Sequence, residues 1–173
     1  MSNPEASAST LSDVVSDNHG RWRRWMRDAV LTAFLLFVLA GVSGLFDLTH
    51  RAEADGDGVL AVIETPLTTR AGSDIQLALD LTNETGLPRQ VTLRIERSYL
   101  ALFEDLSFTP QPVAERAVAP EAVELVFEVP EGARTVRISA EGRAADAWTP
   151  TATGALTVEP GEQEFTLRTW RLP

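Results

Sequence analysis

The side chains that most often carry catalysis are scarce in this sequence. It has no cysteine and two histidines, His19 and His50, both ahead of residue 59. A Ser-His-Asp triad, a Cys-His pair and a His-ligated zinc site all need one of these residue types. The sequence therefore predicts no enzyme, no catalytic residues, no metal site and no cofactor for the C-terminal part of the chain.

Adjacent carboxylates offer the remaining route to chemistry. Glu104 and Asp105 lie between Phe103 and Leu106, where apolar neighbours could raise a carboxyl pKa as acid/base catalysis requires. Adjacent acids in a loop are common, however, and strongly perturbed carboxylates are not. We favour a solvated polar edge over a hydrolase for this pair.

The tetrad Asp55-Gly56-Asp57-Gly58 also carries two carboxylates. A calcium loop needs several more oxygen ligands at set spacing, including a bidentate acid, and these are missing. The tetrad is therefore predicted to be a glycine turn.

The charge of the chain argues against nucleic acid as a partner. All 15 basic residues are arginine, 25 residues are acidic, and the net charge is −10. The whole excess of acids follows the apolar run described next. Binding to phosphates demands a basic face, so we expect none here.

The N-terminal region predicts a membrane anchor. Residues 1–20 are polar and read as a disordered cytoplasmic tail, and residues 21–28 form a basic juxtamembrane segment. Arginine suits the anionic inner leaflet and tryptophan the headgroup belt. The membrane-interface residues predicted on this basis are Arg21, Trp22, Arg23, Arg24, Trp25 and Arg27.

Residues 29–46 are uncharged over 18 positions, which predicts a transmembrane helix in the lipid bilayer. Because arginines precede the run and acids follow it, the N-terminus is placed in the cytoplasm and the C-terminal domain outside the cell membrane, in a single-pass topology. The alternative is a cleaved signal peptide, since Ala52 and Ala54 fit the small-residue pattern of a cleavage site after Ala54.

Beyond this run the apolar pattern has a period of two. Residues 47–58 are short and polar and predict a stalk, whereas residues 59–173 predict a β-sandwich. In 75–81 and 91–95, apolar and polar residues alternate as in half-buried antiparallel strands. We expect about seven or eight strands, with 98–108 as a crossover containing one or two helical turns.

The stretch TTRAGSDIQLALDLTNETGLPRQVTLRIE, Thr68 to Glu96, resembles bacterial immunoglobulin-like adhesion modules in its glycine turns and alternating strands. The layout of tail, span and sandwich also looks like that of single-span membrane proteins of high-GC, actinobacterial-type bacteria. These resemblances imply an immunoglobulin-like extracytoplasmic fold, with no activity attached.

The function predicted from these features is binding. Loops and sheet edges would contact another envelope or membrane protein through Tyr99, Phe103, Phe108 and Trp148. The alternative is a module that binds a small ligand or a carbohydrate, secreted if the N-terminal segment is cleaved. The sequence leaves the oligomeric state open.

Overall fold

The computed structural model describes residues 18–42, 48–118, 121–147 and 149–172. The chain divides into two compact units, residues 1–45 and residues 46–173. The first contains one helix and the second contains all the strands, and each is described by itself.

Helix α1, Asn18–Val42, corrects the predicted membrane anchor. No helix among the described residues is both long enough and apolar enough to cross a membrane, so the predicted transmembrane helix is wrong. The described helix contains four arginines and Asp28 between residues 21 and 28, ahead of its uncharged residues, so charged side chains occupy much of its length. The predicted cellular location stays a prediction.

The residues predicted to lie at a membrane interface occupy the first turns of α1. Trp22 and Trp25 are exposed, and their ring centroids are 5.8 Å apart in a stacked arrangement. Arg27 pairs with Asp28 at 3.1 Å, and both side chains are exposed. Arg23 and Arg24 are exposed too, and the side chain of Arg21 lies outside the described part of the chain.

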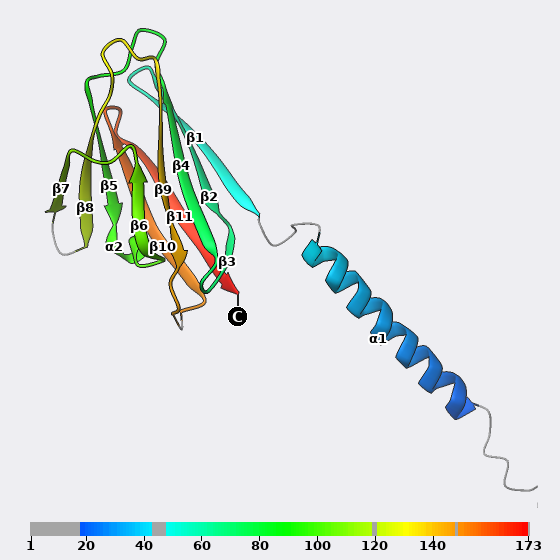
Figure 1. Cartoon of the computed structure of the whole chain (residues 1–173). Coiled ribbons are helices and arrows are strands. Elements are labelled where there is room, and N and C mark those ends of the chain that lie inside the picture. The colour runs from blue at the N-terminus through cyan, green and yellow to red at the C-terminus, as the bar shows by residue number, and fades with distance from the viewer. Residues whose placement is uncertain (1–17, 43–47, 119–120, 148, 173) are drawn as a thin grey trace, which may run out of the picture. The chain divides into compact units, whose positions relative to one another are not determined.

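The second unit is a sandwich of two β-sheets, as the alternating pattern predicts (Figure 1). Sheet A contains, in spatial order, β1 (Thr49–Gly56), β2 (Val59–Pro66), β4 (Asp74–Thr82), β9 (Thr135–Ala144) and β6 (Phe103–Thr109). Sheet B contains β3 (Thr68–Arg70), β11 (Gln163–Leu172), β10 (Thr151–Glu159), β5 (Gln90–Glu96), β8 (Ala122–Glu128) and β7 (Ala114–Val118). A single turn of helix, α2 (Arg97–Leu100), links β5 to β6.

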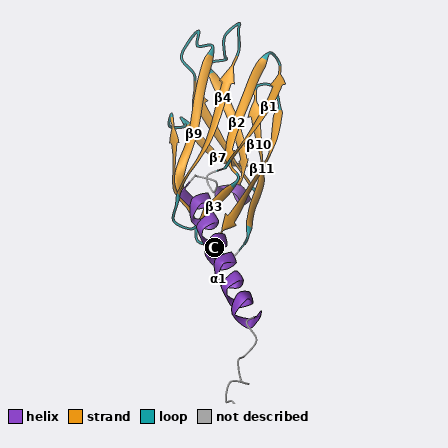
Figure 2. Ribbon diagram, turned by 90° about the vertical axis from the view of Figure 1, so that its right-hand side faces the viewer, coloured by secondary structure: helices purple, strands orange, loops and turns teal. Residues whose placement is uncertain are grey.

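Neighbouring strands are antiparallel except for β3, which runs parallel to β11. Figure 2 shows the long strands of the sandwich from a second side. The sandwich therefore has eleven strands in the described part of the chain, more than the sequence predicts. The extra strands are mostly short or charged, so their apolar alternation is weak.

The core lies between the two sheets and is built by the residues that alternate inward. Leu79 and Leu81 of sheet A face the core opposite Leu93 and Phe127 of sheet B, and each is 0 or 1% exposed. Full burial of such side chains stabilises the fold by about 1.5 to 3 kcal/mol each. Burial on this scale explains how the domain holds together without disulfides.

The segment predicted as a stalk, residues 47–58, contains strand β1 and a hairpin turn. In β1, Ala52 and Ala54 pack against the core, while the charged residues that alternate with them, Arg51, Glu53 and Asp55, face outward. Asp57 and Gly58 both have positive φ, 53° and 73°, and they join β1 to β2. This is the two-residue type I′ turn that Asp-Gly favours. The Asp-Gly tetrad is therefore the end of a strand followed by a turn.

Candidate binding groove

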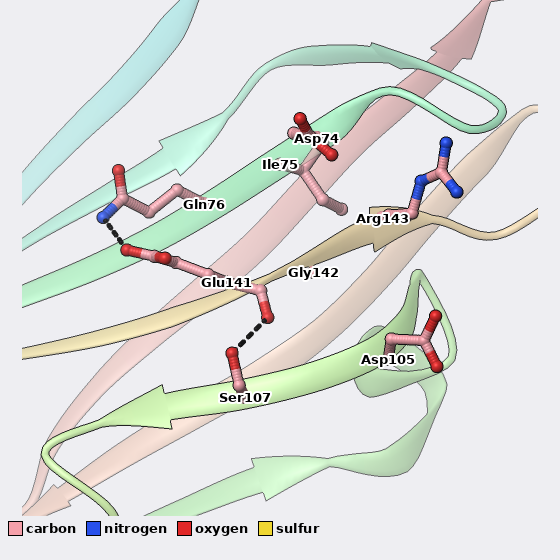
Figure 3. Close-up of a pocket in the computed structure, with 8 residues that line it drawn as sticks. All are labelled: Asp74, Ile75, Gln76, Asp105, Ser107, Glu141, Gly142 and Arg143. Carbon is pink, nitrogen blue, oxygen red and sulfur yellow. Dashed lines mark hydrogen bonds between the residues drawn. The ribbon is translucent and has the colours of Figure 1, made fainter.

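A groove opens on the outer face of sheet A, where β4, β9 and β6 run side by side (Figure 3). Its volume is about 580 Å³. The groove is lined by Asp74, Ile75, Gln76, Asp105, Ser107, Glu141, Gly142 and Arg143. Most of these side chains are polar or charged, so the groove suits a polar ligand.

The groove exists because β6 is irregular. The pairing of β6 with β9 shifts register between Glu104 and Ser107, which is a β-bulge, and Asp105 in the bulge has a φ of 53°. A Cβ atom on Gly142 would lie 2.7 Å from the carbonyl oxygen of Glu104. Only glycine lets β9 approach the bulge this closely, so Gly142 is required for this wall of the groove.

Hydrogen bonds hold one end of the groove in place. The side-chain amide of Gln76 donates to Glu141 Oε1 at 2.9 Å. The hydroxyl of Ser107 donates to the backbone oxygen of Glu141 at 3.3 Å. Together they connect β4, β9 and β6 across the floor of the groove.

The other end of the groove carries charged side chains that do not take part in hydrogen bonds of this kind. Asp74 and Arg143 are opposite each other on β4 and β9, and Asp105 projects from the bulge. These three side chains make no hydrogen bond or ion pair with other described residues. With Glu141 the groove holds three carboxylates against one guanidinium, an excess of negative charge on an acidic domain. The described residues include no group of three or more His, Cys, Asp or Glu side chains that could hold a metal ion.

The aromatic residues predicted to bind a partner do not form a surface. Tyr99 is 0% and Phe103 is 9% exposed, with their ring centroids 6.1 Å apart. Phe108 is half-buried, and its ring lies 6.0 Å from the core residue Phe127. Trp148 lies outside the described residues. Phe103 and Phe108 face inward because both occupy core-facing positions of β6, on either side of the bulge.

The hydroxyl group of Tyr99 is buried and hydrogen-bonded. The hydroxyl of Thr169 donates to the backbone oxygen of Pro66 at 2.6 Å, so the Tyr99 hydroxyl, 3.0 Å away, must donate to Thr169. Burial raises the pKa of Tyr99 from 10 to about 12. This chain of bonds joins α2, β11 and the end of β2.

The carboxylate pair considered for catalysis is exposed. Glu104 and Asp105 both face solvent at the edge of sheet A, and Asp105 alone lines the groove. The pair therefore lies at a solvated edge, in the arrangement favoured from the sequence.

Most groove residues were not singled out from the sequence, although one signal was present. Gly142 interrupts the alternating run of β9, and an isolated glycine inside a strand indicates a bulge or a close backbone approach. Asp74, Glu141 and Arg143 gave no signal, because a charged residue on an outward strand position is ordinary.

Sheet B presents a different surface around Trp170. The side chain of Trp170 is 45% exposed on the outer face of β11. The guanidinium carbon of Arg168 lies 4.5 Å from the ring centroid, a cation–π contact. Thr151 of β10 and Thr68 of β3 lie beside Trp170 on either side.

Comparisons with known proteins give no family for this chain. No family description matches the sequence, and no curated protein matches it. Among solved structures, a chain described under "AvmM Catalyzes Macrocyclization in Alchivemycin A Biosynthesis" is 14% identical, with 72% of this chain and 98% of that chain covered and a TM-score of 0.34. So low a TM-score carries no argument about this chain.

Proposed function

We propose that the sandwich is a non-catalytic binding module whose groove on sheet A receives a basic segment of another protein. The observation that carries this proposal is the groove itself, with Asp74, Asp105 and Glu141 beside a single arginine. The arginine or lysine side chains of a partner could form ion pairs with Asp74 and Asp105, the groove carboxylates that have no bond to other described residues.

The shape of the groove supports a peptide segment over a compact ligand. It runs over three strands and is open to solvent, and its floor is fixed by backbone and side-chain hydrogen bonds. A preformed surface of this kind loses little entropy on binding. Arg143 would supply a hydrogen-bond donor for a carbonyl or carboxylate next to the basic residue.

The net charge of −10 adds a long-range attraction for basic partners. Such attraction raises the association rate and weakens with salt. Binding should therefore be strongest at low ionic strength.

The test titrates the full-length protein with a peptide of alternating arginine and serine, followed by calorimetry. The charge-neutralising double variant Asp74→Asn with Asp105→Asn should bind this peptide about tenfold more weakly. The control variant is Glu131→Gln, which removes an exposed carboxylate, paired with Arg89, from a turn outside the groove and should change binding less than about twofold.

The groove variant removes two charges and Glu131→Gln removes one. Losses of binding free energy in that two-to-one proportion would show attraction to the net charge alone and would contradict the proposed site. Equal binding of a glutamate–serine peptide would contradict it as well. Phe103→Ala is unsuitable as a test, because it removes a buried side chain and would weaken the fold itself.

Trp170 favours a second candidate function, binding of a carbohydrate. An exposed tryptophan ring stacks on the apolar face of a sugar, and neighbouring hydroxyl and guanidinium groups bond its hydroxyls. Trp170 has Arg168 and Thr151 beside it on the outer face of sheet B. Titration with soluble polysaccharides should change the tryptophan fluorescence of the native protein and leave that of a Trp170→Phe variant unchanged. The same response in both proteins would contradict this candidate.

A further inference from the structure

Strand β1 is the one regular free edge of the sandwich in the described part of the chain. Four strands end the two sheets: β1 and β6 in sheet A, β3 and β7 in sheet B. β3 has three residues, β7 has five, and β6 is broken by a bulge. β1 pairs with β2 at all eight of its positions without a break.

A long, regular edge exposes unpaired backbone groups that can take another strand. Proteins blunt such an edge by shortening it, bulging it or placing charged side chains on it. The other three edges here are short or bulged. β1 is neither, and its outward positions carry Arg51, Glu53 and Asp55, of which Arg51 and Glu53 pair within the chain at 3.1 Å.

The register shows which groups of β1 are free. The backbone N–H of Leu67 donates to the oxygen of Leu48 at 2.8 Å, which makes these two residues a hydrogen-bonded pair. Pairing then alternates, so that His50, Ala52 and Ala54 bond to β2. Pro66, which has no N–H, faces Thr49 at a position that needs none. Four residues, Thr49, Arg51, Glu53 and Asp55, therefore direct their backbone groups to the open edge.

The side chains of these residues are self-complementary. When a second copy of β1 is laid antiparallel about a two-fold axis at Ala52, Arg51 stands opposite the partner's Glu53, and Glu53 opposite the partner's Arg51. Thr49 stands opposite the partner's Asp55. All of these are positions with free backbone groups, so charge and hydrogen-bond register agree. Moving the axis by one position to either side would put Arg51 opposite the partner's Arg51, or Glu53 opposite the partner's Glu53.

The edge is also held rigid before pairing. The type I′ turn at Asp57 and Gly58 fixes β1 against β2. The side-chain amide of Gln163 in sheet B donates to the backbone oxygens of Gly56 at 3.2 Å and Val59 at 2.8 Å. The strand is therefore presented in its paired conformation and loses little entropy on association.

We propose that the chain forms a two-fold dimer in which β1 pairs with β1 of a second copy. The two copies of sheet A then form one continuous ten-stranded sheet. The groove of each copy lies at the opposite end, beside β6, and stays open. The dimer does not depend on what the groove binds, and it would present two grooves to a partner with repeated segments.

The first experiment is sedimentation equilibrium of the full-length protein and its charge variants. The wild type should approach twice the monomer mass of 18.8 kDa as its concentration rises. Glu53→Arg alone and Arg51→Glu alone each create two like-charge contacts, and each should weaken the dimer by about tenfold or more.

Two rescues test the register. The double variant Arg51→Glu with Glu53→Arg exchanges the charges within one chain and should restore the dimer. An equimolar mixture of the two single variants should form a heterodimer as strong as the wild type, because each supplies the charge that the other needs. Dimers of Glu53→Arg as strong as those of the wild type would overturn the proposal, and so would a wild type that stays monomeric.

A cross-link tests the position of the axis. The chain has no cysteine, so Ala52→Cys provides a single thiol on the two-fold axis, where facing Cα atoms would be about 4.5 to 5.5 Å apart. Mild oxidation should give a covalent dimer. The control His50→Cys faces the partner's Ala54 and should give none. Equal cross-linking of both variants, or of neither, would overturn the proposed register.

Discussion

The two edge strands of sheet A, β1 and β6, differ in how regular they are. Both β1 and β6 are edge strands with unpaired backbone groups. β6 has a bulge beside Gly142, which removes a regular edge and leaves a groove, whereas β1 pairs with β2 without a break as far as the Asp-Gly turn that follows it. An irregular edge strand such as β6 therefore leaves a concave polar groove, whereas a regular edge strand such as β1 leaves a row of backbone groups that another strand can pair with.

The largest effect should come from filling the space under the bulge. Gly142→Val puts a branched side chain against the carbonyl oxygen of Glu104 and should lower the free energy of unfolding by about 2 to 4 kcal/mol. Urea denaturation measures the change. Thr135→Val, at the exposed opposite end of β9, should stay within about 0.5 kcal/mol of the wild type. A stable Gly142→Val protein with an unchanged groove would show that the close approach is not needed.

The free energy of unfolding should also fall at high pH, because of Tyr99, which packs against Phe103 of β6. The pKa of Tyr99 is raised to about 12, so the unfolded chain loses its tyrosine proton near pH 10 while the folded chain keeps it. The stabilisation is complete below pH 10 and is lost as pH rises to 12, a fall of about 2 to 3 kcal/mol.

Tyr99 is the only tyrosine of the chain, so tyrosinate absorbance reports its ionisation directly. Tyr99→Phe leaves Thr169 without its donor, should cost about 1 to 2 kcal/mol at neutral pH, and should flatten the loss between pH 10 and 12. Ionisation of the folded protein near pH 10 would contradict the buried hydrogen bond.

A smaller effect is expected at the β1 end. Gly58→Ala forces a side chain into a φ of 73° and should cost about 1 kcal/mol in thermal or urea unfolding. Asp57→Asn, at the preceding turn position, should be neutral because asparagine tolerates positive φ. A neutral Gly58→Ala would mean that β1 is not fixed by this turn.

The smallest effect is expected at Asp105, where two variants distinguish the role of backbone strain from the role of the charge. Asp105→Gly relieves a positive φ and should raise stability by about 0.5 kcal/mol while weakening the binding of a basic peptide. Asp105→Asn should weaken binding as much without that gain. A destabilised Asp105→Gly protein would show that the aspartate is favoured in the bulge for its contacts.

The sequence predicted the sandwich because large apolar residues recur at every second position of its core strands. Ile75 to Leu81 and Val91 to Ile95 bury these residues, and the two segments belong to β4 and β5. It missed β1, whose inward residues are histidine, alanines and glycine, too small or polar to mark a strand. It also placed Tyr99 and Phe103 on a surface, because burial depends on which sheet lies opposite.

The amphipathic alternation, the acidic charge and the absence of cysteine were set by the sequence alone, since each is a property of local composition. The bulge over Gly142 and the open edge of β1 were decided by the folded chain. Those features depend on which distant strands meet. The order of residues does not say how close two strands far apart in the chain will lie. The groove depends on this, because it forms where β4, β9 and β6 come together.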